Sequence, residues 1–287
     1  MKEKENTKTK MEKRRLSTWI KILIALVVLN SLALLFNFFA VPEIKYQKAL
    51  KLVDERQYAS AIEIFTELGT YKDSAAQLIP IYDIVNSYIQ VGSKVYFGTY
   101  EQDNNTTNGK EKIEWKVLAV EKDKALLISA KNLDCLPYSL EDKAMTWEKS
   151  MLRSWLNAEF LNAAFNQEEQ EAILPTEVRT RNNLQYRTVG GEAVKDKIFI
   201  LSIDEADQYF KSDRDRVAKN TAYAVEKKAF DSPEGNGWWW LRTPGIEENM
   251  ASNVNYSGTI DEYGNYVYSF GGCVRPALWI SQKDLRP

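Results

Sequence analysis

The chain has 287 residues, of which 44% are hydrophobic and 27% are charged, and its formal net charge is −2. This length allows one large domain with an additional segment, and the near-neutral charge does not favour nucleic acid as a partner. The sequence contains no histidine, which excludes Ser-His-Asp and Cys-His catalysis, HExxH zinc sites and imidazole pH switches. We therefore expect no metal site, no cofactor and no recognisable catalytic constellation.

Residues 18–42 contain an uncharged apolar run, ILIALVVLNSLALLFNFFAVP, from Ile22 to Pro42. At about 1.5 Å per residue, a helix of this length spans the roughly 30 Å hydrocarbon core of a bilayer. The run is longer than the apolar region of a cleaved signal peptide, and no small-residue cleavage site follows it. The sequence therefore predicts a single transmembrane helix, with the lipid bilayer as a partner of residues 18–42.

The tail before this run, residues 1–17, carries seven Lys or Arg against three Glu, a net charge of +4 (7 minus 3). Positively charged flanks remain on the cytoplasmic side of a membrane. We therefore predict a single-pass protein of the cell membrane, with a cytoplasmic N-terminus and an extracytoplasmic C-terminal domain.

Residues 43–90 show helical spacing. Tyr46, Ala49 and Val53 repeat with a helical period, a second set follows a short break, and Pro80 is expected to kink a third stretch. The string YQKALKLVDERQYASAIEIFTEL resembles a tetratricopeptide-type helical pair. Only about one repeat is present, whereas free-standing stacks usually need roughly three. We expect a short helical stalk; the alternatives are a peptide-binding groove and a docking element for a membrane partner.

Residues 91–287 change to short strands, turns and helices. A helix is expected from an N-cap at Thr146 to Phe165, and Asn166 and Glu169 have the spacing of a capping box. A further helix is expected at 203–210, and strands are expected at 94–102, 113–120, 124–133, 196–202, 254–260, 266–270 and 273–280. Because these elements show no βαβ rhythm, they predict the α+β class.

The string GNGWWWLRTPG, residues 235–245, contains three consecutive tryptophans. In an extended strand Trp238 and Trp240 share one face, and Trp239 lies on the other. These side chains are expected either to fill a core or to place Trp238 or Trp240 in a groove, where the ring stacks on a sugar, a base or a peptide aromatic.

Arg242 and Arg275 each occur in an apolar motif close to a proline. A buried guanidinium needs a partner, because an isolated charge is costly in the interior. The candidate partners are Asp134, Glu148, Asp196 and Asp204. Either the two arginines brace the fold, or one of them faces a cleft and binds an anionic group.

Cys135 and Cys273 are far apart in the sequence, and outside the cytoplasm they can form a disulfide. Two buried free thiols are the alternative. The loop at 103–114 matches part of a calcium-loop template, but Asn108 stands where that template requires glycine, so a hairpin loop without metal is expected.

Several motifs occur in order along residues 91–282: VYFGTYEQD, IEWKVL, ALLIS, TWEKSMLRSWLN, DKIFILS, WWWLRTPG and VRPALW. Together they resemble an uncharacterised domain family of Gram-positive bacteria that often follows a membrane anchor or helical repeats. That family is similar in turn to C-type-lectin-like domains, including formylglycine-generating enzymes, which implies a lectin-like fold. The copper-holding cysteine pair of those enzymes and the calcium loop of the lectins have no matching context here.

We therefore predict a membrane-anchored module that recognises a cell-envelope glycan, peptide or protein without catalysis. Its candidate ligand-binding residues are Trp238, Trp240, Arg242 and Arg275. Two other functions remain open: an envelope-modifying enzyme that uses carboxylates or cysteines on a formylglycine-generating-enzyme-like fold, and a scaffold subunit that docks a membrane partner through its helical stalk.

Overall fold

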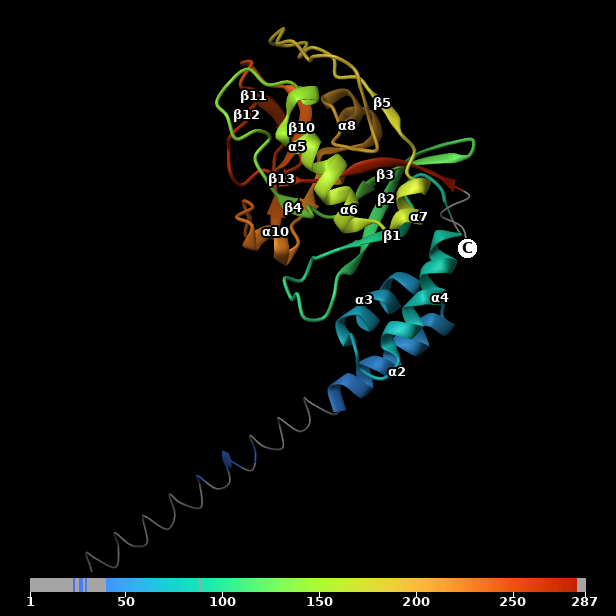
Figure 1. The fold of residues 1–287 in the computed structure, drawn as a ribbon. Coiled ribbons are helices and arrows are strands. Elements are labelled where there is room, and N and C mark those ends of the chain that lie inside the picture. The colour runs from blue at the N-terminus through green and yellow to red at the C-terminus, as the bar shows by residue number, and fades with distance from the viewer. Residues whose placement is uncertain (1–22, 24–25, 28, 30–39, 88, 283–287) are drawn as a thin grey trace, which may run out of the picture. The chain divides into compact units, whose positions relative to one another are not determined.

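The computed structural model describes residues 23, 26, 27, 29, 40–87 and 89–282. The chain divides into two compact units, residues 1–81 and residues 82–287, which are described separately (Figure 1). The division falls within a helix, earlier than the boundary expected after residue 90.

The first unit contains helices where the sequence predicts them. They are α2 (Val41–Asp54), α3 (Tyr58–Leu68) and the first part of α4 (Ser74–Asn86), which contains Pro80. The periodic apolar residues of α2 and α3 pack together, and the ring of Tyr46 meets that of Phe65 edge-on at 5.9 Å. Glu43 of α2 connects this helix to the segment after α3. It accepts a hydrogen bond from the Tyr71 hydroxyl and forms an ion pair with Lys72.

The transmembrane helix in the predicted fold class is not supported. None of the helices in the described residues has both the length and the apolar character needed to cross a membrane. Helix α2, for example, is too short and too polar to cross a bilayer. Its 14 residues span only about 21 Å of the roughly 30 Å hydrocarbon core, and it carries Glu43, Lys45, Lys48 and Lys51. Most of the predicted segment, residues 18–42, lies outside the described residues.

The second unit is a mixed α+β structure with two five-stranded sheets. The first sheet has the order β1 (Lys94–Tyr100), β2 (Glu111–Glu121), β3 (Lys124–Ser129), β14 (Ala277–Ser281) and β7 (Ile198–Phe199). The second has the order β12 (Ile260–Tyr266), β11 (Met250–Val254), β10 (Trp239–Pro244), β13 (Cys273–Val274) and β4 (Asp134–Cys135). Two short pairs accompany them: β5 (Thr176–Val178) with β6 (Val194–Asp196), and β8 (Ala218–Lys219) with β9 (Asn236–Gly237).

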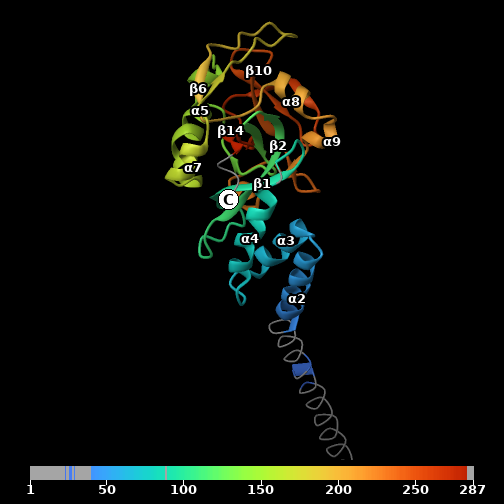
Figure 2. The same cartoon turned by 90° about the vertical axis from the view of Figure 1, so that its right-hand side faces the viewer.

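Short helices surround the sheets. They are α5 (Met151–Trp155), α6 (Leu161–Ala164), α7 (Gln167–Ala172), α8 (Ile203–Tyr209), α9 (Asp213–Arg216) and α10 (Ala222–Glu226), with a 3₁₀ turn at Trp147–Lys149 and a π-helical turn at Leu156–Phe160. Figure 2 shows α5 and α7 on one side of the first sheet and α8 and α9 on the other. One continuous apolar core joins the two sheets and these helices, except α9, which contains only charged residues.

β2 and β3 coincide with the strands expected at 113–120 and 124–133, and they pair as a hairpin that closes between Glu121 and Lys124. The last strand differs from the prediction. The chain leaves the second sheet after Val274 and enters the first sheet at Ala277, so that Arg275 and Pro276 form the crossover. Proline has no N–H to donate to a sheet ladder, and it therefore suits a point where one strand ends and another begins.

Three further elements depart from the expectations. The α-helix after residue 146 is capped by Ser150 instead of Thr146, because the Ser150 hydroxyl accepts the Arg153 N–H. The single strand expected at 196–202 is divided between the end of β6 and the short β7, which lies at the edge of its sheet. The turn between β11 and β12 lies at 255–259, not at 261–265. The capping box of Asn166 and Glu169 is confirmed.

Candidate functional site

The three tryptophans have different surroundings. Trp239 and Trp240 are fully buried, and their indole N–H groups donate to the carbonyls of Arg216 and Leu136. Trp238 is half-buried, and its indole N–H donates to no described residue. The rings of Trp238 and Trp240 lie 4.7 Å apart on the same face of the strand, as alternation predicts. Trp240 therefore fills the core, and Trp238 alone of the three keeps a polar edge available to a ligand.

Arg242 is buried and braces the fold. Its Nη2 lies 2.7 Å from Glu205 Oε1, and its Nη1 pairs with the other carboxylate oxygen and donates to the Ile200 carbonyl at 2.8 Å. Glu205 also completes the N-terminal capping box of α8 with Ser202. The predicted partners were therefore wrong for this arginine, and its guanidinium does not face a cleft.

Arg275 is also buried, and none of the described carboxylates pairs with it. Its Nε donates to the Ser129 carbonyl at 3.0 Å and its Nη1 to the Arg216 carbonyl at 2.9 Å. The guanidinium lies 4.9 Å from the centre of the Trp239 ring, and burial lowers its pKa to about 9. Carbonyl oxygens and an aromatic face thus take the place of the expected carboxylate. The arginine joins the two sheets at their crossover.

Cys135 and Cys273 are free thiols, yet they are direct partners across the antiparallel pair β4–β13. Side chains at opposed positions lie on the same face of a sheet. Burial raises the pKa of the Cys135 thiol to about 11, and that of Cys273 well above its ordinary value. Of the two alternatives drawn from the sequence, the structure contains two buried thiols and no disulfide.

The raised pKa of Cys135 predicts slow alkylation. Its rise from 9.0 to about 11 lowers the thiolate fraction at neutral pH about 100-fold, and only the thiolate reacts. Iodoacetamide labelling, followed by mass spectrometry, should therefore be about 100-fold slower than for the urea-unfolded chain and should accelerate with pH. Because the unfolded thiol loses its proton first, the free energy of unfolding should fall between about pH 9 and pH 11. Equal labelling rates for the folded and unfolded chain would contradict this environment.

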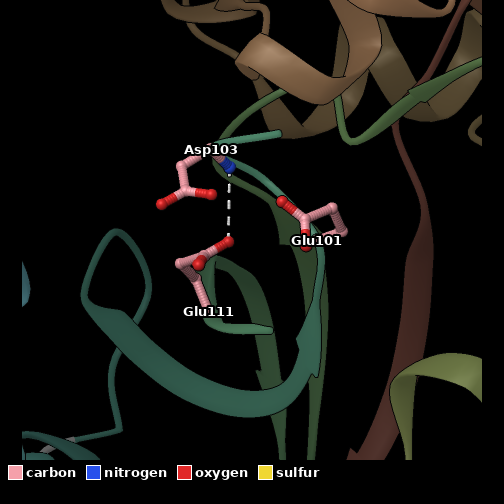
Figure 3. A group of neighbouring side chains, drawn as sticks. All are labelled: Glu101, Asp103 and Glu111. Carbon is pink, nitrogen blue, oxygen red and sulfur yellow. Dashed lines mark hydrogen bonds between the residues drawn. The ribbon is translucent and has the colours of Figure 1, made fainter. Parts of the chain in front are cut away.

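Glu101, Asp103 and Glu111 form an acidic cluster where the loop between β1 and β2 begins and ends (Figure 3). One oxygen of each carboxylate lies within 4.8 Å of the others. Main-chain N–H groups already donate to them: Asn105 to Glu101, and Gln102 and Asp103 to Glu111. The hydrogen bond from the Asn108 amide lowers the pKa of Asp103, whereas burial raises the pKa of Glu111. These contacts explain the cluster as the means by which the loop is folded.

A cleft of about 520 Å³ opens beside α8. Its lining comes from residues 181–184, from one face of α8, and from Ile260 and Glu262 of β12. Arg216 and Thr243 contribute to it from α9 and β10. None of the four predicted ligand-binding residues lines this cleft, and neither does an aromatic side chain.

Comparison with known protein families gives one match. The model of a domain of unknown function, DUF6273, matches residues 122–282, more than half of the chain. The chain belongs to this family. No curated protein and no solved structure matches it significantly.

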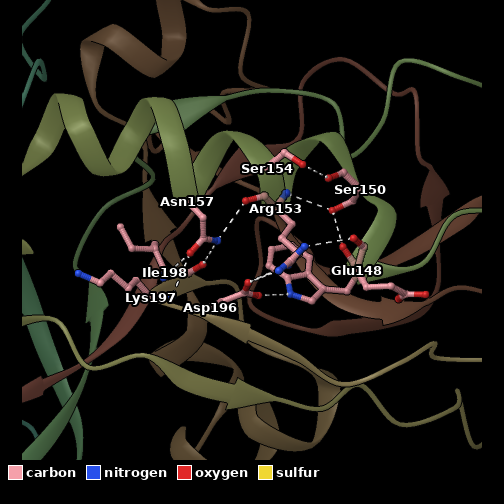
Figure 4. A network of polar contacts seen from close by, with 9 residues as sticks. Glu148, Ser150, Arg153, Ser154, Asn157, Asp196, Lys197 and Ile198 are labelled. Atoms are coloured by element: carbon pink, nitrogen blue, oxygen red, sulfur yellow. Dashed lines mark hydrogen bonds and ion pairs between the residues drawn. The ribbon is translucent and has the colours of Figure 1, made fainter.

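The DUF6273 region contains a polar network that explains one of the sequence motifs, TWEKSMLRSWLN (Figure 4). Asp196, which is 2% exposed, accepts hydrogen bonds from Trp147 Nε1 at 2.9 Å and from Arg153 Nε at 2.7 Å. Asn157 binds the main chain of Lys197 and Ile198 with both its amide oxygen and its amide nitrogen. These side chains fasten the helical segment to β6 and β7, so the motif has a structural role.

Sequence reasoning missed the residues that line the cleft of the DUF6273 domain. Asp204 is expected only as a candidate partner of the two arginines, Asp207 lies in the helix expected at 203–210, and Glu262 lies between the strands expected at 254–260 and 266–270. They come from segments that are distant in the sequence, and neither hydrophobic period nor turn composition indicates that such segments meet. A signal in the sequence was the apolar Leu184 within the polar string TRNNLQYRT, and the structure shows this side chain to be exposed.

Proposed function

We propose that the C-terminal unit is a recognition module that binds a glycan chain of the cell envelope without catalysis. The observation that carries this proposal is the aromatic surface formed by Phe230, Trp238, Tyr256 and Phe270. Phe270 is 76% exposed, and Phe230 and Tyr256 are each more than 40% exposed. The C-type-lectin-like relationship suggested by the motifs and the placement outside the cytoplasm are compatible with this role.

Ring contacts and a main-chain hydrogen bond bring together the segments that carry these four residues. The rings of Phe230 and Tyr256 lie 5.4 Å apart, and the Phe230 N–H donates to the carbonyl of Gly271, the residue after Phe270. Gly272 lies against Trp238, because a Cβ added to it would come within 2.7 Å of the Trp238 ring. Only glycine allows the chain to pass so close to the tryptophan at this position, which lies two residues after Phe270.

The chemistry of this surface suits a sugar. Aromatic rings stack on the apolar face of a pyranose, and the free indole N–H of Trp238 can donate to a hydroxyl. A stacked pair of tyrosines, Tyr266 and Tyr268, lies a few residues away, with ring centres 5.3 Å apart and an angle of 20° between the rings. A single exposed aromatic residue is common on protein surfaces and needs no explanation. Several exposed aromatic residues close together are typical of interaction sites.

The side chains considered for an enzymatic role have other partners. Glu205 pairs with Arg242, Glu169 caps α7, and Asp204 pairs with Arg181. The raised pKa of Cys135 disfavours a thiolate nucleophile. These partners favour recognition over catalysis. The helical unit remains a candidate docking element for a membrane partner.

The test compares the full chain with Phe270→Ala and Trp238→Ala in a pull-down on insoluble peptidoglycan and wall polysaccharide. Each variant should lower the retained fraction about two- to tenfold, because a stacked aromatic pair contributes roughly 0.5–1.5 kcal/mol beyond its buried area. Val91→Ala removes another exposed apolar side chain, 64% exposed, elsewhere in the unit, and it should leave retention unchanged. Phe270 is exposed, so its variant should keep the melting temperature; unchanged retention by this variant would refute the proposal.

A further inference from the structure

The cleft beside α8 has a charge and a shape that the aromatic surface does not share. Its volume, about 520 Å³, falls within the range of roughly 300–1,000 Å³ that is usual for small-molecule sites. The cleft is formed entirely by residues of the C-terminal unit, and its floor includes the buried Ser202 and Thr243.

The basic side chains of the cleft are already neutralised. Arg216 is 7% exposed; it pairs with Asp213 and donates to the carbonyls of Gly258 at 2.9 Å and Ala206 at 3.4 Å. Arg181 pairs with Asp204 at 3.3 Å at the solvent-exposed edge. Both guanidinium groups are therefore in ion pairs with carboxylates of the protein, which disfavours the binding of an anionic ligand.

Two carboxylates of the cleft remain without such compensation. The Glu262 carboxylate makes no hydrogen bond or ion pair with any residue that the structure describes, although its carbonyl accepts from Asn183. The side chain of Asp207 is 81% exposed, and it lies 4.0 Å from the Arg216 guanidinium. That guanidinium forms a closer ion pair with Asp213. Because Asp213 offsets Arg216 and Asp204 offsets Arg181, Asp207 and Glu262 leave the cleft with an excess of negative charge.

The cleft also offers an apolar wall. Leu184 is 79% exposed, and Ile203 and Ile260 are half-buried. Aliphatic stems of charged side chains pack along such surfaces while their charged ends remain solvated. A metal ion fits less well, since in the described part of the chain only Glu101, Asp103 and Glu111 bring three carboxylate oxygens close enough to share one.

We propose that this cleft binds a primary ammonium group on an aliphatic stem. The ammonium lies between Asp207 and Glu262, and the stem covers Leu184 and Ile260. A lysine side chain of a peptide has this chemistry, and an amino sugar offers the same cation on a ring. This site is separate from the aromatic surface, so it stands independently of the glycan-recognition proposal.

The test is calorimetric titration of the full chain with the terminally blocked peptide Gly-Lys-Gly, with its Nε-acetyllysine and norleucine forms, and with glucosamine. The lysine peptide should bind at least tenfold more tightly than the acetylated and norleucine forms, and the affinity should fall as salt rises. Binding of glucosamine without the lysine peptide would support the ammonium site with an amino sugar as its source. Equal affinity for the three peptides, or no binding of either amine, would overturn the proposal.

Two variants locate the binding. Asp207→Asn and Glu262→Gln remove negative charge and keep the shape of the side chains. The double variant should bind the lysine peptide about tenfold more weakly than the wild type does. Glu159→Gln, an exposed glutamate outside the cleft, is the matched control. Trp238→Ala should leave this affinity unchanged, which separates the result from the test of the aromatic surface. Full affinity in the double variant would place the ligand elsewhere and refute the site.

Discussion

Replacing Trp240 with alanine is expected to lower the free energy of unfolding of the C-terminal unit by about 3–5 kcal/mol, the usual cost of deleting a buried tryptophan. Trp240 is fully buried, its ring lies 5.8 Å from that of Tyr138, and its indole N–H donates to Leu136 at 3.0 Å. The substitution removes these contacts and leaves the Leu136 carbonyl without its donor. It therefore costs both packing and a buried hydrogen bond.

Urea unfolding of the full chain measures this effect. Trp238→Ala is the comparison, because it removes the neighbouring residue on the same face but deletes a half-buried ring with no hydrogen bond to a described residue. We expect a smaller loss for that variant, about 1.5 kcal/mol or less, since the ring is only partly buried and its indole N–H has no partner among the described residues. If Trp240→Ala were as stable as the wild type, the buried position of Trp240 would be wrong, and its role as a ligand platform would need to be considered again.

Replacing Arg242 with alanine is the second change with a large expected effect, a loss of about 3–5 kcal/mol in the free energy of unfolding. Arg242 is 3% exposed, and its removal leaves the Ile200 carbonyl without its donor and the Glu205 carboxylate without its cation, although the Ser202 N–H still donates to that carboxylate. The lost contacts of the buried guanidinium account for most of the cost, because the Glu205 carboxylate left behind is 27% exposed and keeps some contact with solvent. Arg242→Lys should recover only part of it, because an ammonium cannot make the two-pronged contact with the carboxylate.

A double-mutant cycle with Glu205→Gln measures the coupling between these two residues. The double variant should be more stable than the sum of the single losses predicts, because it removes the orphaned charge. Arg179→Ala is the control: its side chain is 71% exposed, and its ion pair with Glu177 is exposed as well, so little change is expected. A loss below about 1 kcal/mol for Arg242→Ala would contradict the bracing role, because removing a buried charged group from its ion pair usually lowers the free energy of unfolding by several kcal/mol.

Features with a local cause could be read from the sequence. The helical period of Tyr46, Ala49 and their neighbours predicts α2 and α3, and the spacing of Asn166 and Glu169 predicts the capping box of α7. Alternation places Trp238 and Trp240 on one face of a strand. The absence of a βαβ rhythm predicts the α+β class that the structure shows.

Local signals failed where two local solutions compete. Thr146 and Ser150 are both good N-cap residues, and the 3₁₀ turn at Trp147–Lys149 gives the α-helical cap to Ser150. The segment at 261–265 is rich in turn-forming residues, yet it pairs with β11, while the turn forms at 255–259. In both cases the choice depends on the surface against which the segment packs, which composition does not report.

The sequence by itself determined which residues share a face, which residues can cap a helix, and which reactions the lack of histidine excludes. Only the tertiary structure decided what covers each face: β10 lies inside its sheet with both faces buried, so Trp239, Trp240 and Arg242 became core and Trp238 alone kept solvent contact. It also brought Cys135 opposite Cys273 and joined α8, β12 and residues 181–184 around one cleft. The physical reason is that backbone geometry repeats over a few residues, whereas burial and charge compensation depend on segments that the chain brings together from far apart.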